Sequence, residues 1–396
     1  MMSKRKYLIN PAKKKKTDVL KKIKEKQQAA AKTITPAEKT ADIPRKKPAR
    51  KFKPRHMLTK RRMNWKIPSF FFVSALMLII LVIPTLIVVP FGEDQQHEAT
   101  TVETKAEPAV ELASSPVSVS VMRHAYDEVE NVDLEEYVVR VVASEMPAEF
   151  ETEALKAQAL AARTYIVNHK LYTDETDEYD VTDTVMHQVY KDDYELQKQW
   201  GSDYDWKINK IKEAVNDTQG EILTYNDAPI TPAFFSTSNG YTENSEDYWE
   251  DELPYLRSVE SRWDEDSPKF RDQKTFSMEQ VEEALEIELP NNESFDIEVT
   301  RTDSERVDQL VLNGNELSGR EVREKLELQS SDFSIKQRDN HLIFTTKGYG
   351  HGIGMSQYGA NGMAEEGNSY QDIVKYYYKD VEVSTVTDSA PALVSR

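Results

Sequence analysis

A single carboxylate in an unusual place is the first feature of the sequence that suggests chemistry. Glu145 lies in the stretch Ser144-Glu145-Met146-Pro147, between two segments with apolar helical spacing. Pro147 disfavours helical backbone at the residue before it, so Glu145 should sit at a corner between two helices. A carboxyl group partly withdrawn from water has a raised pKa and suits proton donation near neutral pH. The structural alternative is a carboxylate that only interacts with a helix dipole.

Two polar clusters further along the chain could line a ligand cleft. Residues 234–241 (FFSTSNGY) place small hydroxyl and amide side chains after an apolar strand, where they could bind a sugar or simply form a turn. Residues 348–359 (GYGHGIGMSQYG) alternate glycines around His351, and such glycines let the backbone approach a ligand or adopt positive φ. His351 could face a ligand, hold the fold through hydrogen bonds or act as a base.

Other catalytic arrangements find less support. The Gly-rich stretch lacks the spacing of a phosphate-binding loop, and no nucleophile elbow accompanies a triad of Ser236 or Ser238 with His351. The absence of cysteine removes disulfides, thiolate zinc sites and cysteine nucleophiles. Hydrolytic glycosidases generally need two carboxylates that flank the bond, and no second one stands at a convincing position. A one-carboxylate mechanism, in which a hydroxyl of the substrate attacks the anomeric carbon, is therefore the economical one.

The elements that must hold these residues follow from hydrophobic periodicity and turn residues. In the first half of the folded part the patterns predict a strand at 117–122, helices at 134–144, 151–170 and 207–216, and a hairpin at 222–235. Further helices are expected at 278–285, 319–326, 360–366 and 371–378, and further strands at 295–300, 309–312 and 341–346. The expected fold class is α+β: a mixed α/β domain over 117–385, with a smaller α/β lobe inserted at about 267–340 and a tail at 386–396.

The N-terminal region has the layout of a membrane-anchored protein. Residues 1–66 carry 24 Lys/Arg and 4 Asp/Glu, whereas the rest of the chain has a net charge of about −38. An uncharged helix over 67–91 would be long enough for a hydrocarbon core of ~30 Å. The positive-inside rule then predicts a single-pass anchor, a disordered basic tail in the cytoplasm, a flexible linker at 92–116 and the large domain outside. A cleaved signal peptide and a translation start at Met63 are the alternatives.

Together, the three motif regions resemble the stage II sporulation protein D family. The similarity is carried by 136–165 (EYVVRVVASEMPAEFETEALKAQALAARTY), 234–243 (FFSTSNGYTE) and 347–364 (KGYGHGIGMSQYGANGMA), and it runs from about residue 67 to 385. The resemblance implies a lytic transglycosylase that cleaves peptide-free glycan strands of peptidoglycan and leaves 1,6-anhydro-N-acetylmuramic acid ends. It places the protein in the cell membrane on the mother-cell side of the septum, in septal wall degradation and engulfment during sporulation.

The resemblance also assigns individual residues and partners. The catalytic glutamate falls on Glu145, and the candidates for substrate binding are Gln158, Arg163, Ser236, Ser238, Asn239, His351 and Gln357. The implied partners are stage II sporulation protein P, an amidase that removes stem peptides, and stage II sporulation protein M. Some relatives carry a Cys/His zinc site in the segment equivalent to Val181–Tyr190. With no cysteine and only His187 nearby, we expect no metal and no cofactor here.

A second class of function stays open beside the enzyme. Related domains occur in amidase enhancers, so the fold is also compatible with a non-catalytic peptidoglycan-binding scaffold that recruits and activates a cell-wall amidase. A carboxylate at the position of Glu145 favours the enzyme, because a scaffold does not need one. Binding of nucleic acid by the basic tail is a weaker third hypothesis, since the rest of the chain is strongly acidic and lies across the membrane. No specific nucleic-acid partner is expected.

Overall fold

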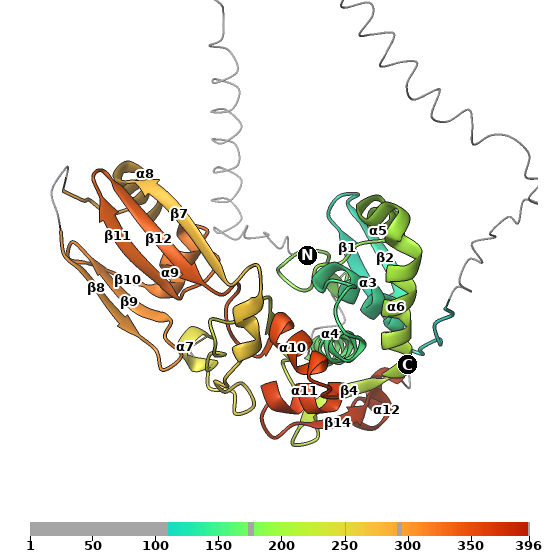
Figure 1. Ribbon diagram of the computed structural model, residues 1–396. Coiled ribbons are helices and arrows are strands. Elements are labelled where there is room, and N and C mark those ends of the chain that lie inside the picture. Colours follow the sequence, from blue (N-terminus) through green and yellow to red (C-terminus); the bar gives the residue numbers. More distant parts are fainter. Residues whose placement is uncertain (1–109, 173–177, 250, 291–294, 395–396) are drawn as a thin grey trace, which may run out of the picture. The chain divides into compact units, whose positions relative to one another are not determined.

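The computed structural model describes residues 110–172, 178–249, 251–290 and 295–394, which form an α+β fold with two hydrophobic cores (Figure 1). The larger core takes residues from Val117 to Val259 and again from Ile353 to Leu393. The smaller core takes residues from Met278 to Phe344. Because residues of the larger core come both before and after the smaller core in the sequence, the smaller unit is an insertion. We call residues 271–347 the lobe and the rest of the described chain the body.

The predicted basic tail, the anchor at 67–91 and most of the linker at 92–116 lie outside the described residues. Among the helices that the structure does describe, none is long and apolar enough to cross a membrane. The last part of the predicted linker is described, and it contacts the body. The backbone N–H groups of Val110 and Ala113 donate to the side-chain oxygens of Asn209 and Asn216, both at 3.3 Å.

A long buried helix forms the centre of the body. Helix α4 (Thr152–Tyr172) is rich in alanine, which favours helix and allows close packing. It packs against α3 (Leu134–Glu145), α6 (Tyr204–Asp217), α10 (Gln357–Glu365) and α11 (Tyr370–Tyr377). Smaller helical elements of the body are α5 (Asp193–Trp200), η2 (Gly201–Asp203), α7 (Glu246–Trp249) and η3 (Arg262–Asp266).

The corner after α3 has the geometry that the proline imposes. The side chain of Asp133 caps the start of α3 by accepting from the N–H of Glu135 at 2.9 Å. The helix ends at Glu145, and Met146 is already extended, with φ −122° and ψ 138°. The prediction that Glu145 stands between two helices is therefore confirmed.

Small sheets flank the helices of the body. Strand β1 (Ser118–Arg123) pairs antiparallel with β2 (Glu128–Asp133) and parallel with β3 (Val181–Thr182). Strand β4 (Glu221–Tyr225) lies between β14 (Glu382–Thr385) and β5 (Ala228–Pro229).

The predicted hairpin at 222–235 is only partly correct. Asn226 and Asp227 have positive φ, as a tight hairpin turn requires, but only Ala228–Pro229 pair with β4. The chain then leaves that sheet, and β6 (Phe234–Phe235) pairs parallel with β13 (Met355–Ser356). This pairing places the second and third sequence motifs beside each other.

The lobe consists of two three-stranded sheets and two helices (Figure 1). One sheet has the order β11-β12-β7 and the other the order β10-β9-β8, and α8 and α9 complete the core. Their bounds are β7 Arg271–Ser277, α8 Met278–Leu285, β8 Ile297–Arg301, β9 Val307–Leu312, β10 Asn315–Ser318, α9 Gly319–Lys325, β11 Phe333–Arg338 and β12 His341–Lys347. The sequence did not predict β7, β10 or β11, because polar residues dominate them and they present little apolar alternation.

The chain continues to pack beyond residue 385, where a tail was predicted. Helices α12 (Val386–Ser389) and α13 (Pro391–Val394) follow β14. Val386, Ala390 and Leu393 are buried in the larger core. These residues are therefore part of the body.

Candidate active site

Glu145 and His351, which are far apart in the sequence, line the same pocket of about 350 Å³. The walls come from residues 185–189, which follow β3, and from residues 231–234, which precede and enter β6. Trp249 and Tyr165 complete the lining, which is largely apolar. Among the described residues that line this pocket, Glu145 is the only carboxylate.

Glu145 is held at the pocket by the end of α3 and by two contacts from distant segments. The backbone N–H of Val189 donates to its Oε1 at 2.8 Å, and Gln357 Nε2 donates to its backbone carbonyl at 3.1 Å. Burial raises the pKa of the Glu145 carboxyl group, while the Val189 N–H and the positive charge of Lys191 lower it by less. The carboxyl group therefore keeps its proton to a higher pH than an exposed glutamate does, which suits a general acid.

His351 is a neutral, fixed imidazole. Its Nδ1 accepts from the N–H of Ile353 at 3.0 Å, so the ring proton is on Nε2, and the ring also hydrogen-bonds to the Phe234 backbone. Burial, together with the positive charges of Arg323 and Arg306, lowers the pKa of His351 to about 3. Such a group is a poor base at neutral pH, so the geometry favours a side chain that shapes the pocket.

Gln158 and Gln357 support the Glu145 corner from behind. Gln357 Nε2 lies 3.4 Å from Gln158 Oε1 in addition to its contact with Glu145. Gln158 is fully buried on α4, and its Nε2 has no hydrogen-bond partner among the described residues. Neither side chain is among the residues that line the pocket, so the structure places both of them behind Glu145.

Ser238 belongs to a buried brace centred on Asp264. The Asp264 carboxylate accepts from the Ser238 N–H at 3.0 Å and from three hydroxyls: Ser238 at 2.8 Å, Ser261 at 2.6 Å and Ser356 at 2.5 Å. Burial raises the pKa of Asp264, and the hydroxyl donors lower it by less. The brace joins the second motif to the third. Sequence reasoning missed Asp264, since it lies in neither motif.

The other two predicted substrate-binding residues of the second motif, Ser236 and Asn239, also make internal contacts. Ser236 accepts through its backbone carbonyl from the N–H of Tyr358 at 3.1 Å, and its hydroxyl lies 3.4 Å from that of Thr237. Asn239 Nδ2 donates to the Ser304 carbonyl at 2.8 Å and to Asp332 at 3.0 Å. Asn239 thus connects the body to the lobe, and neither residue lines the pocket of Glu145.

Arg163 lies in the core and not in the predicted cleft. Its guanidinium is 0% exposed and pairs with Glu135 at 2.7 Å. It also donates to the backbone carbonyls of Glu221 at 3.0 Å and Val215 at 3.3 Å. Because internal acceptors take up its donors, Arg163 joins α3, α4 and the start of β4 and makes no contact with the pocket.

The segment after β3 supplies pocket residues that sequence reasoning did not name. Val189 provides the N–H to Glu145, and Gln188 accepts from the Tyr137 hydroxyl at 3.1 Å while its Nε2 has no partner among the described residues. The sequence offered one signal for them, because the resemblance had drawn attention to Val181–Tyr190 as a zinc segment in some relatives.

The residues of that segment do not fit a zinc site. His187 Nδ1 accepts from the Thr182 N–H at 3.2 Å, and its ring packs edge-on against His169 with centroids 5.2 Å apart. Over the described ranges, no group of three His, Cys, Asp or Glu side chains is arranged to hold a metal ion.

Comparisons with known proteins show what this chain is similar to. Residues 122–225, which include Glu145 and the segment after β3, match the family model described as Stage II sporulation protein. The chain is 49% identical over 322 residues to Stage II sporulation protein D of Bacillus subtilis (strain 168), covering 78% of this chain and 94% of that protein. The protein of the same name from Bacillus amyloliquefaciens is 49% identical over 331 residues, covering 80% and 96%. The Amidase enhancer of Bacillus subtilis (strain 168) is 30% identical over 296 residues, covering 60% of this chain and 39% of that protein.

Proposed function

This chain belongs to the stage II sporulation protein D family, and we propose that it is a lytic transglycosylase that cleaves peptide-free glycan strands of peptidoglycan during sporulation. The observation that carries the proposal is the pocket of Glu145. It holds one carboxyl group, with a raised pKa, among the described residues that line it. Hydrolysis generally needs a second carboxylate, whereas intramolecular transfer does not.

In the proposed reaction Glu145 donates one proton and then accepts another. Protonated Glu145 donates its proton to the glycosidic oxygen as the bond to the anomeric carbon breaks. The Glu145 carboxylate next accepts the proton of the C6 hydroxyl of the same N-acetylmuramic acid, whose oxygen attacks the anomeric carbon. The products are a free 4-hydroxyl on the leaving sugar and a 1,6-anhydro end, and no water is consumed. The Val189 N–H stabilises the carboxylate between the two transfers.

The place of action and the partners form part of the same proposal. A single-pass anchor at 67–91 holds the basic N-terminus in the cytoplasm and presents the body to the wall on the mother-cell side of the septum. The charge reversal between residues 1–66 and the rest of the chain supports this orientation. The proposed partners are the amidase stage II sporulation protein P, which removes stem peptides, and stage II sporulation protein M.

A non-catalytic scaffold that recruits and activates a wall amidase is the second candidate. It is favoured by the similarity to a protein named Amidase enhancer. Both candidates require glycan binding, but only the enzyme changes the glycan.

The product of the purified protein separates the two candidates. Full chain in detergent is incubated with glycan strands whose stem peptides have been removed, and the products are identified by mass spectrometry. The enzyme yields 1,6-anhydro-N-acetylmuramic acid ends. Intact strands that bind the protein would support the scaffold, and new reducing ends would mean hydrolysis instead of transfer.

A further inference from the structure

The N–H that contacts Glu145 belongs to a segment with little regular structure of its own. Residues 183–192 connect the two-residue strand β3 to α5, and Val189 lies inside this connection. Two backbone hydrogen bonds lie within it, from the His187 N–H to the Thr184 carbonyl at 3.0 Å and from the Tyr190 N–H to the Asp183 carbonyl at 3.4 Å, and only the second, longer one joins its two ends. The position of the Val189 N–H therefore depends on what holds the ends of the segment.

One buried arginine holds both ends. Arg123, the last residue of β1, is 3% exposed. Its Nε donates to Asp183 at 3.2 Å, at the start of the segment. Its Nη1 contacts Asp192 at 3.3 Å and its Nη2 contacts Glu195 at 2.5 Å, at the far end.

The middle of the segment is fixed by the same group and its neighbour. The Arg123 guanidinium lies over the Tyr190 ring, 5.0 Å from its centroid. Arg140 donates to the Tyr190 hydroxyl at 2.6 Å, and the Tyr190 ring stacks on Tyr137 with centroids 5.7 Å apart. The residue next to Val189 is thus held on two sides.

We infer that Arg123 is a positioning residue for Glu145, because it joins the two ends of residues 183–192 and so holds the Val189 N–H against the carboxylate. Its role in catalysis rests on the proposed function, whereas its role in holding this contact does not. Arg123 is not among the residues that line the pocket.

The other charged and titratable groups around Glu145 fix the sign of the expected effect. Lys191 lies on the same segment and also favours the carboxylate. His187, His351 and Tyr165 line the pocket, and burial lowers the pKa of both histidines and raises that of Tyr165, so all three are neutral near pH 7. Tyr137 on α3 is neutral for the same reason. Release of the segment removes the Val189 N–H and moves Lys191, and both changes raise the pKa of Glu145.

Two substitutions of opposite charge test the inference. Arg123→Gln removes a positive charge, which by charge alone raises the pKa of nearby carboxyl groups. Asp183→Asn removes a negative charge, which by charge alone lowers it. Both substitutions break the clamp, so positioning predicts that both raise the pKa of Glu145, by about one pH unit for the loss of a charged hydrogen bond. Arg123→Lys keeps one contact and should give a smaller rise.

The pKa is measured on the full chain by ¹³C NMR of glutamate carboxyl groups, with the Glu145 signal assigned by its loss in Glu145→Gln. The alkaline limb of the pH–rate profile for glycan cleavage should move upward by the same amount. Arg301→Gln, which removes an arginine of the lobe that contacts Asp332 and the Phe333 carbonyl, should move neither. Shifts of opposite sign for Arg123→Gln and Asp183→Asn, or no shift in either, would overturn the inference. If the wild type does not cleave glycan, the proposed function fails and the NMR result still decides the clamp.

Discussion

Three carboxylates near the sequence motifs have different surroundings, and these surroundings give them different tasks. Glu135 is 1% exposed and satisfied by Arg163. Asp264 accepts from three hydroxyls and one N–H inside the body. Glu145 has one N–H donor on its carboxylate and otherwise faces a pocket. Of the three, Glu145 is the carboxyl group placed to exchange a proton with a ligand.

The raised pKa of Glu145 predicts how its replacement changes stability with pH. The folded state keeps this proton above pH 4.5 while the unfolded state loses it, so the group costs stability as pH rises through the folded pKa. Glu145→Gln removes that cost and still offers an oxygen to the Val189 N–H. Its melting temperature should exceed that of the wild type by about 1–3 °C at pH 8, and the difference should vanish at pH 4. Differential scanning calorimetry at both pH values measures this difference. A melting temperature of Glu145→Gln at or below that of the wild type at pH 8 would count against the prediction.

Arg163 gives a second prediction at this scale. Removing one member of a buried ion pair leaves the other charge without a partner, so Arg163→Met should lower the free energy of unfolding by about 3–5 kcal/mol. Urea unfolding measures the change. A variant with wild-type stability but weakened glycan binding would indicate instead that Arg163 binds substrate, as the sequence suggested.

The difference between Glu145 and Arg163 shows which site residues a sequence can reveal. The position of Glu145 at a helix end was predictable, because apolar helical spacing followed by Pro147 is a local signal. Arg163 and Ser238 stand in equally conspicuous motifs, but their roles depend on Glu135 and Asp264, which are 28 and 26 residues away. No local sequence pattern predicts those partners. Val189 was missed for a related reason, since it acts through its backbone and its side chain carries no signal.

At the scale of elements, the pair of β6 and β13 does most to assemble the pocket. It sets Phe234 beside Met355, in parallel, and so brings the wall of the pocket next to the Gly-rich loop that carries His351. The hairpin prediction failed here because the mostly apolar residues 230–235 could pair with any strand, and the actual partner lies more than a hundred residues further on. The helices were easier to predict, since their periodicity and caps are local.

A comparison of two glycines with positive φ distinguishes the cost of a steric clash from the cost of backbone strain. Gly354 has φ +78°, and a Cβ there would collide with the backbone carbonyl of Ala233. Gly367 has φ +90° and open space around it. Gly367→Ala should therefore cost about 1 kcal/mol from strain alone, whereas Gly354→Ala should cost at least about twice as much, because β13 must move away from the chain before β6. Urea unfolding of both variants provides the comparison, and equal losses would mean that the close approach at Gly354 is unimportant.

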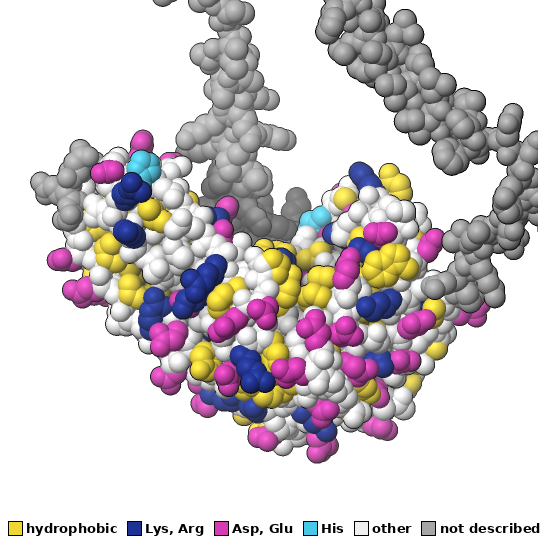
Figure 2. All heavy atoms as spheres, in the orientation of Figure 1, with side chains coloured by type: hydrophobic (Ala, Val, Ile, Leu, Met, Phe, Trp, Pro, Cys, Tyr) yellow, Lys and Arg dark blue, Asp and Glu magenta, His cyan; other side chains and the backbone are white. Residues whose placement is uncertain are grey.

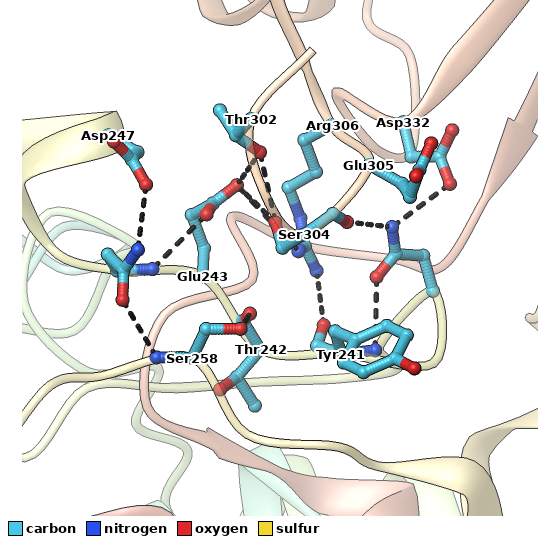
Figure 3. A network of polar contacts seen from close by, with 12 residues as sticks. Tyr241, Thr242, Glu243, Asp247, Ser258, Thr302, Ser304, Glu305, Arg306 and Asp332 are labelled. Carbon is cyan, nitrogen blue, oxygen red and sulfur yellow. Dashed lines mark hydrogen bonds and ion pairs between the residues drawn. The ribbon is translucent and has the colours of Figure 1, made fainter.

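At the scale of the whole molecule, a buried polar network joins the body to the lobe (Figure 3). Glu243 of the body accepts from the hydroxyls of Thr302 at 2.9 Å and Ser304 at 2.6 Å. Arg306 donates to Ser304 at 2.9 Å and to the Tyr241 carbonyl at 3.0 Å. Glu243, Ser304 and Arg306 are buried, so these contacts attach the lobe to the end of the second motif.

The charge of the chain predicts how glycan cleavage depends on salt. Residues 67–396 carry a net charge of about −38, and acidic side chains are spread over the visible face of the described residues (Figure 2). Removal of a stem peptide leaves a lactyl carboxylate on the proposed glycan substrate, which the acidic protein should therefore repel at long range. The rate at low substrate concentration should rise about two-fold or more between 10 and 150 mM salt, as screening increases. A rate that falls with added salt would indicate a cationic glycan-binding surface instead.

The central claim is that Glu145 transfers the proton, and a matched pair of variants tests it most directly. Glu149 lies four residues further on at the same corner, but it is exposed, and its contact with Lys207 lowers its pKa. We predict that Glu145→Gln abolishes the release of 1,6-anhydro ends from peptide-free glycan while glycan binding persists, and that Glu149→Gln cleaves like the wild type. Cleavage at the wild-type rate by Glu145→Gln would contradict the account.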